Sequence, residues 1–78
     1  MNIVFSDHAE LKIRQRKLSR QKILLTVVHP DFRVPGHSGR ERLLKKFGKN
    51  HLQVVVLHEV NTTVVVTVHW VAKLPKKQ

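Results

Sequence analysis

The 78-residue chain contains no cysteine and no tyrosine, and it has a single tryptophan. Without cysteine there is neither a disulfide nor a thiolate metal site, a composition that fits the reducing interior of a cell. With one Trp and no Tyr, few aromatic side chains are available to stack on nucleobases. Any contact with nucleic acid is therefore expected to involve backbone phosphates more than bases.

Long hydrophobic runs are also missing. The longest apolar run, Val64 to Val71, is interrupted by Thr67 and His69 and is far too short to span a bilayer. The amino terminus has no basic region leading into an apolar segment, so no signal peptide is expected. These absences predict one small cytoplasmic domain over residues 1–78 with no membrane partner. A domain of this size buries only about 60% of its unfolded surface.

Acidic residues are few, with 5 Asp and Glu against 15 Lys and Arg, and the net charge is +10. No Lys or Arg lies between Leu52 and Ala72, so the positive charge lies before this stretch and at the carboxy terminus. Such a field attracts polyanions or an acidic protein, although basic residues can also serve solubility alone. The candidate nucleic-acid-binding residues are Lys12, Arg16, Arg20, Arg40, Arg42, Lys45 and Lys46.

The stretch from Leu52 to Val71 is the centre of the predicted fold. Two runs rich in β-branched residues flank a polar break at Asn61-Thr62, which is typical of a β-hairpin. With a loop at these two residues, Val60 faces Thr63, and alternation along the strands defines two faces. A loop one residue longer would exchange them. The predicted core face holds Val55, Leu57, Val64, Val66, Val68 and Trp70. The opposite face holds Val54, Val56, His58, Val65, Thr67, His69 and Val71.

Two helices are predicted before this hairpin. A polar helix from about His8 to Lys17 follows the N-cap signal Ser6-Asp7. A second helix, about Arg20 to His29, follows Ser19, and Pro30 ends it. Its predicted apolar stripe consists of Ile23, Leu24, Val27 and Val28.

The other segments complete an α+β prediction. A short strand is expected at residues 2–5, a loop at 31–39, and a strand at 40–47 that runs antiparallel to residues 52–59. The predicted order is β-α-α-β-β-β, a small antiparallel sheet with two helices packed on one face. Because the helices cover one face only, we expect a second copy of the chain or a partner segment on the valine-rich opposite face.

Two short motifs near the amino terminus carry a family resemblance. The segments Ser6-Asp7-His8-Ala9 and Arg16-Lys17-Leu18-Ser19 resemble a domain-of-unknown-function family in the RelE/ParE-like toxin superfamily. Its members open with a short strand and a His-Ala pair, followed by Arg-x-Ile/Leu-Ser eight residues after the His. The step His29-Pro30-Asp31 and the closing hairpin are similar to the same family. Where the family often has Arg-Met, this chain has Lys12-Ile13, which keeps the charge but loses the bidentate guanidinium.

The resemblance implies a RelE/ParE-like fold and a role in a toxin–antitoxin module. It implies RNA, free or on the ribosome, as the substrate, and an acidic antitoxin-like protein as the partner that covers the basic surface. A non-catalytic nucleic-acid-binding or protein-interaction domain of the same fold is the main alternative. The third possibility is a nearly inert member of a toxin-like family.

The residues themselves give a chemical hypothesis. His8, Lys12 and Arg16 are spaced at i, i+4 and i+8 and so lie along one side of the predicted helix. A His moves protons near neutral pH, while Lys and Arg hold a phosphate or stabilise charge that develops on it. Cleavage of RNA by its own 2′-hydroxyl needs these two functions and no metal. The chain is therefore a candidate metal-independent endoribonuclease, and His69 joins the site if the last strand runs beside this helix.

As an alternative to a catalytic role, the histidines can have purely structural roles. His8 can cap or pack near the helix start with both cations solvated, and His58 and His69, expected on one hairpin face near opposite ends, can be half-buried residues with satisfied hydrogen bonds. None of the 6 histidines forms a His-x-x-x-His spacing, and there is no cysteine, so neither a metal nor a cofactor is expected.

Overall fold

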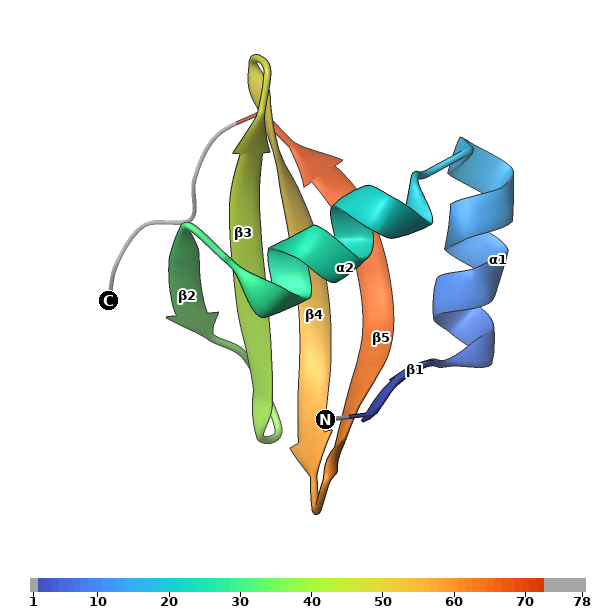
Figure 1. Ribbon diagram of the computed structural model, residues 1–78, viewed down its shortest axis with the longest axis vertical. Coiled ribbons are helices and arrows are strands. Elements are labelled where there is room, and N and C mark those ends of the chain that lie inside the picture. Colours follow the sequence, from blue (N-terminus) through green and yellow to red (C-terminus); the bar gives the residue numbers. More distant parts are fainter. Residues whose placement is uncertain (1, 73–78) are drawn as a thin grey trace.

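The computed structural model describes residues 2–72, which form one sheet and two helices (Figure 1). The C-terminal lysines Lys73, Lys76 and Lys77 lie outside the described residues. No helix in residues 2–72 is long and apolar enough to cross a membrane. The elements in chain order are β1 (Asn2–Phe5), α1 (Asp7–Arg16), α2 (Arg20–Val28), β2 (Phe32–Pro35), β3 (Arg40–Phe47), β4 (Asn50–Glu59) and β5 (Thr62–Val71).

The five strands form a mixed sheet in the order β1-β5-β4-β3-β2. The α+β class and the antiparallel pairing of β3 with β4 are confirmed. The expectation of a purely antiparallel sheet is wrong, because β1 runs parallel to β5 at one edge. The helix α2 crosses over β3 and β4, and α1 lies beside β5 (Figure 1).

The strand β2 lies where the sequence predicted a loop. Phe32 pairs with Leu44, and Pro35 pairs with Glu41 at the end of the strand. The segment was predicted as a loop because Pro30, Pro35, Gly36 and Gly39 lie in or beside it. Proline is tolerated on an edge strand, however, because the missing N–H is not needed there. The chain then turns through Ser38 and Gly39, both at positive φ (57° and 76°), as a tight hairpin turn requires.

The helix boundaries agree with the prediction to within one residue. The Ser6 hydroxyl accepts a hydrogen bond from the Ala9 backbone N–H at 3.0 Å, which caps α1. The Ser19 hydroxyl accepts from the Lys22 N–H at 3.2 Å and caps α2 in the same way. Pro30 follows the last residues of α2 as expected.

The predicted faces of the long hairpin are wrong over most of its length. Glu59 pairs with Thr62, so the turn is at Val60-Asn61, one residue earlier than expected. Asn61 takes the positive φ (60°) of this turn, and Val60 is 90% exposed. The faces are therefore exchanged, since side chains alternate along a strand. Val54, Val56 and Val65 are buried under the helices, while Val55, Leu57, Val64 and Val66 are only partly buried.

A β-bulge corrects the register farther along β5. Val56 pairs with Val65, but Val55 pairs with Thr67, which leaves Val66 as an extra residue. The bulge returns the last part of β5 to the predicted alternation. Val68 is buried in the core as expected, and Trp70 lies on the same side but is 37% exposed.

The core lies between the helices and one face of the sheet. In α2, Ile23 and Val27 are buried as predicted, but Leu24 and Val28 are exposed. Thr26 faces the sheet in their place, and its hydroxyl donates to the Lys22 carbonyl at 2.8 Å, so a buried polar group is satisfied within the helix. The core consists of Ala9, Ile13, Leu18, Ile23, Val27, Leu43, Leu52, Val54, Val56, Val65 and Val68.

Two neighbouring residues of α2 give a matched test of this core. Ile23 is fully buried and Leu24 is 38% exposed. We expect Ile23→Ala to lower the free energy of unfolding by about 2–5 kcal/mol, because it leaves a cavity. Leu24→Ala should cost about 1 kcal/mol or less, since its side chain already contacts water. Urea unfolding of both variants measures the difference, and equal losses would contradict the assigned face of α2.

Ser6 connects β1, α1 and β5. Its N–H donates to the Val65 carbonyl at 3.0 Å, and its hydroxyl donates to the Val66 carbonyl at 2.9 Å while it caps α1. Ser19 caps α2 but is exposed, and its hydroxyl makes only the cap contact among the described hydrogen bonds.

Variants of the two serines therefore distinguish the stability that comes from the helix cap from the stability that comes from the hydrogen bond to the sheet. We expect Ser19→Ala to cost about 1 kcal/mol, as a lost N-cap does. Ser6→Ala should cost about 1 kcal/mol more, because the Val66 carbonyl also loses its donor. Thermal or urea unfolding compares the variants, and a smaller loss for Ser6→Ala than for Ser19→Ala would be inconsistent with this role.

Candidate nucleic-acid site beside α1 and β5

The position of α1 follows from the short length of β1. β1 pairs with β5 only as far as Phe5 and Val65, and the chain then turns at Ser6 into α1. Beyond Val65 the edge of β5 is not paired with β1, and α1 packs along it in the same direction (Figure 1). The last strand therefore runs beside the first helix, as the inclusion of His69 in the predicted site requires.

His69 lies on β5 within electrostatic reach of two cations of α1. Burial, and then the positive charges of Arg16 and Lys12, lower the pKa of His69 below its usual 6.5. The imidazole is therefore neutral at pH 7. A neutral imidazole within electrostatic range of two cations combines a proton acceptor with groups that bind a phosphate.

His8 is the more distant member of the predicted set. It is exposed in the first turn of α1. A helix rises about 1.5 Å per residue, so His8 lies about 6 Å along the axis from Lys12 and about 12 Å from Arg16. Lys12 is thus the central residue of the row, with His8 toward one end of the helix.

Gln53 is a site residue that the sequence analysis missed. Its Nε2 lies 2.9 Å from His69 Nε2, and its side chain is almost fully buried on β4. The amide N–H donates to the unprotonated ring nitrogen, a contact that a protonated ring could not accept. This agrees with the lowered pKa of His69. An amide at the second position of the otherwise apolar run 52–57 was the available signal, but its partner depends on the strand register.

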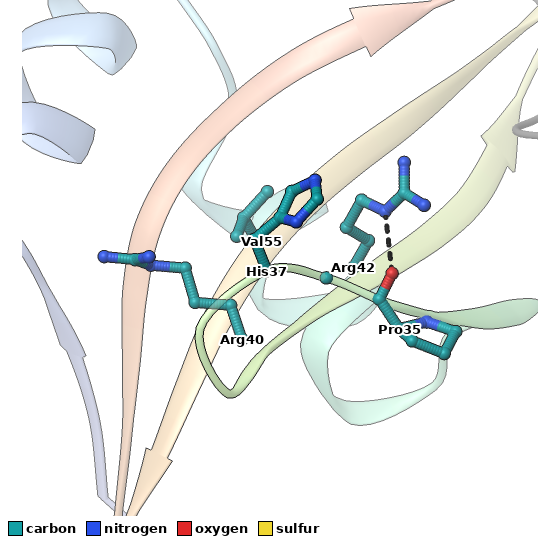
Figure 2. A pocket seen from close by; sticks show the side chains of 6 residues that line it. Pro35, His37, Arg40, Arg42 and Val55 are labelled. Carbon is teal, nitrogen blue, oxygen red and sulfur yellow. Dashed lines mark hydrogen bonds between the residues drawn. The ribbon is translucent and has the colours of Figure 1, made fainter.

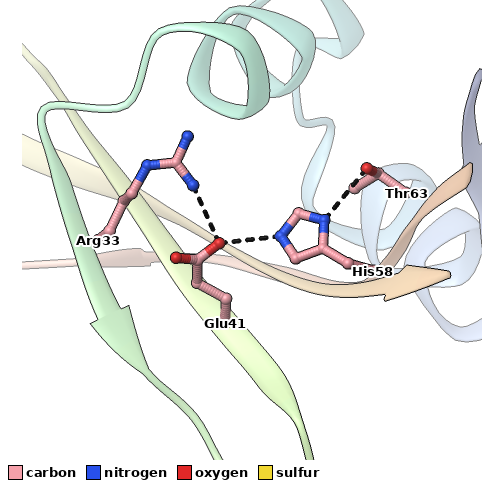
Figure 3. Close-up of polar contacts among 4 residues, drawn as sticks. All are labelled: Arg33, Glu41, His58 and Thr63. Carbon is pink, nitrogen blue, oxygen red and sulfur yellow. Dashed lines mark hydrogen bonds and ion pairs between the residues drawn. The ribbon is translucent and has the colours of Figure 1, made fainter. Parts of the chain in front are cut away.

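His58 belongs to a different network on the other face of the sheet. Its Nε2 lies 2.9 Å from Glu41 Oε1, which also accepts from Arg33 at 3.1 Å, and its Nδ1 lies 3.3 Å from the Thr63 hydroxyl (Figure 3). The order carboxylate, imidazole, hydroxyl is that of a nucleophilic triad. Thr63 is only 2% exposed, however, so a substrate cannot reach its hydroxyl. The network connects β2, β3, β4 and β5.

The expectation that His58 and His69 share a face is wrong. The bulge at Val66 changes the alternation of β5, so His69 pairs with Gln53 on the face away from the helices. His58 pairs with Thr63, whose side chain is buried on the helix side.

The remaining predicted nucleic-acid-binding residues are spread over the molecule. Arg20 forms an ion pair with Glu10. Lys45 donates to the His29 carbonyl at 3.0 Å and lies 3.6 Å from Asp31. These acidic and carbonyl partners reduce the capacity of Arg20 and Lys45 to bind phosphate. Lys46 is exposed on β3, and Arg40 and Arg42 lie at the other end of the same strand.

Comparisons with known proteins add no further identification. No protein-family model, no curated protein and no solved structure matches this chain. Within residues 2–72, no three His, Asp or Glu side chains come together in an arrangement that could hold a metal ion. The resemblance to RelE/ParE-like toxins stays a prediction from the sequence motifs.

The lowered pKa of His69 predicts a pH effect on stability. The unfolded chain binds a proton at this residue near pH 6.5, whereas the folded protein binds it only at lower pH. The contribution to stability is therefore fully present above pH 6.5 and is lost as the pH falls from 6.5 to the folded pKa. We expect the free energy of unfolding to fall less steeply over this range in His69→Gln than in wild type.

Urea unfolding between pH 8 and pH 5 measures this difference. All other histidines are present in both proteins, so the difference between the two curves isolates His69. Parallel curves would show that His69 titrates alike in the folded and unfolded states.

Proposed function

We propose that this protein binds RNA and cleaves it without a metal ion, as a toxin-like endoribonuclease. The observation that carries the proposal is the packing of α1 against β5, which brings Lys12 and Arg16 close enough to His69 for their charges to lower the pKa of its imidazole. The His-Ala and Arg-Lys-Leu-Ser motifs, which resemble RelE/ParE-like toxins, support the same activity. An acidic antitoxin-like partner and a cytoplasmic location belong to this proposal.

The proposed reaction is an intramolecular transesterification. The 2′-hydroxyl of RNA attacks the adjacent phosphorus and gives its proton to the neutral His69 ring. The bond from phosphorus to the 5′ oxygen breaks, which leaves a 2′,3′-cyclic phosphate on one product. His8 supplies the proton that the departing 5′ oxygen takes. Lys12 and Arg16 stabilise the negative charge that develops on the phosphoryl oxygens.

Gln53 acts as a positioning residue in this proposal. Its amide holds the His69 ring at 2.9 Å, and the side chain is buried, so the ring is oriented before the substrate arrives. Because Nε2 accepts from this amide, the amide must move away from the ring before Nε2 can accept the proton of the 2′-hydroxyl. Orientation before binding lowers the cost of reaching the reactive geometry.

A non-catalytic nucleic-acid-binding protein of the same fold is the second candidate. The favouring observation is that Gln53 occupies the basic nitrogen of His69, while His8 is exposed about 12 Å along α1 from Arg16. In this case Lys12 and Arg16 provide phosphate contacts only.

Cleavage of RNA in the presence of EDTA tests the proposal. We expect wild type to cleave, and His69→Ala and His8→Ala each to lose about 100-fold or more in rate, the usual contribution of an acid–base group. Lys12→Gln and Arg16→Gln should weaken both binding and turnover. Arg14→Gln removes one exposed charge from the same helix and is the matched control, with thermal melts to verify folding.

Binding measurements separate the two candidates. Affinity for RNA should fall steeply with salt, because phosphate contacts release counterions. A well-folded wild type that binds RNA in this way but does not cleave it, with or without ribosomes, would favour the binding protein. Equal cleavage by wild type and His69→Ala would exclude His69 from the reaction.

A further inference from the structure

A pocket of about 650 Å³ lies at the hairpin turn between β2 and β3 (Figure 2). Known small-molecule sites have volumes of about 300–1,000 Å³. It opens on the sheet face away from the helices, because Arg42 and Val55 pair across β3 and β4 and alternate with the core residues Leu43 and Val56. The lining residues are Pro35, Gly36, His37, Arg40, Arg42 and Val55.

The turn itself positions the pocket residues. The Gly36 N–H donates to the Arg40 carbonyl at 3.0 Å, and a Cβ atom on Gly36 would lie only 3.0 Å from that oxygen. The Arg40 N–H donates back to the His37 carbonyl at 3.1 Å. The side chains of Arg40 and Arg42 extend to opposite sides of His37 (Figure 2).

The pocket is positively charged and has no carboxylate in its wall. Glu41 follows Arg40 in sequence but lies on the other face, where it accepts from Arg33 and His58. Among the described residues, neither Arg40 nor Arg42 forms an ion pair. The Arg42 Nε donates to the Pro35 carbonyl at 3.3 Å, and its terminal nitrogens point away from that carbonyl (Figure 2).

We propose that this pocket binds the phosphate group of a phosphate monoester. Such a phosphate carries a charge of about −1.5 to −2 at pH 7 and three acceptor oxygens. Arg40, Arg42 and His37 line the pocket with groups that can donate to these oxygens, and Arg suits bidentate phosphate recognition. A phosphodiester has one charge and two non-bridging oxygens, so it matches the pocket less well. Pro35 and Val55 give an apolar wall for the group that the phosphate carries.

The pocket is separate from the candidate site formed by Lys12, Arg16 and His69. Arg42 and His69 lie two strands apart, about 10 Å across the sheet, and are offset by about 7 Å along the strands. His69, Lys12 and Arg16 are not among the residues that line the pocket. The proposal does not depend on RNA cleavage, and the two proposals can fail independently.

NMR titration of the labelled protein tests the proposal. The probes are phenyl phosphate, adenosine 5′-monophosphate and a tetranucleotide RNA with a 5′-phosphate; a dinucleotide with only a phosphodiester is the comparison. We expect saturable shifts at His37, Arg40 and Arg42, and affinity for monoesters about tenfold above the diester, the value of one extra charge-assisted hydrogen bond. Equal affinity for the diester, or shifts elsewhere, would overturn the proposal.

The three monoesters also distinguish two sources of the phosphate. If the 5′-phosphorylated RNA binds more tightly than both adenosine 5′-monophosphate and the same RNA with a 5′-hydroxyl, the terminal phosphate of a nucleic acid is the ligand. If the small monoesters bind equally or more tightly, the ligand is a small phosphorylated molecule. Either result supports recognition of the monoester.

Two double variants with the same loss of charge distinguish binding by the pocket residues from attraction by the net positive charge of the protein. We expect the Arg40→Gln, Arg42→Gln variant to lose about tenfold or more in monoester affinity. The Arg14→Gln, Lys49→Gln variant changes exposed residues outside the pocket and should bind as wild type does. Equal losses in both would show that net charge alone binds the ligand. His37→Ala, in the exposed turn, provides the same test if the first variant does not fold.

Discussion

The arrangement of the molecule depends on the hydrogen bonds of Ser6. This residue ends β1, caps α1, and bonds through both its N–H and its hydroxyl to consecutive carbonyls of β5. One serine thus determines where the helix begins and which strand it lies against. For this reason α1, with its cations Lys12 and Arg16, lies along the strand that carries His69. A helix cap is usually a local feature, but here it also joins two ends of the chain.

The β-bulge at Val66 is the second constraint on the candidate site. Strict alternation from Val65, which is buried under the helices, would put His69 on the helix side as well. The extra residue changes the alternation, so His69 instead pairs with Gln53 on the open face. The Val66 carbonyl accepts from the Ser6 hydroxyl, so the bulge and the helix cap stabilise each other. The polar pair depends on this irregularity.

The sequence was sufficient for features that depend on near neighbours. Ser6, Ser19 and Pro30 mark helix ends through local backbone chemistry, and the helical spacing of Lys12 and Arg16 is equally local. These parts of the prediction agree with the structure. The α+β class also follows from the order of such local patterns.

Features that depend on pairing between distant segments could not be predicted in the same way. A turn shifted by one residue, at Val60-Asn61, exchanges the faces of a strand without any change in composition. The parallel partner of β1 lies about sixty residues away, and the contact of Gln53 with His69 needs the register of the whole hairpin. The edge strand β2 was missed because proline and glycine are more typical of loops.

The few acidic residues determine where the positive charge is available for ligands. Glu10 pairs with Arg20, and Asp31 lies against Lys45. Among the described residues, no ion pair includes Lys12 or Arg16 of α1, or Arg40 or Arg42 of the pocket between β2 and β3.

Alternation along β3 separates charge in the same way. It puts Glu41 on one face, with Arg33 and His58, and puts Arg40 and Arg42 on the other. A single strand therefore separates a neutralised network from a cationic pocket. A basic protein that paired its acids with the arginines of the pocket would have the same net charge but no such site. The positions of Glu10, Asp31 and Glu41, more than the excess of ten basic over acidic residues, decide where this protein can bind an anion.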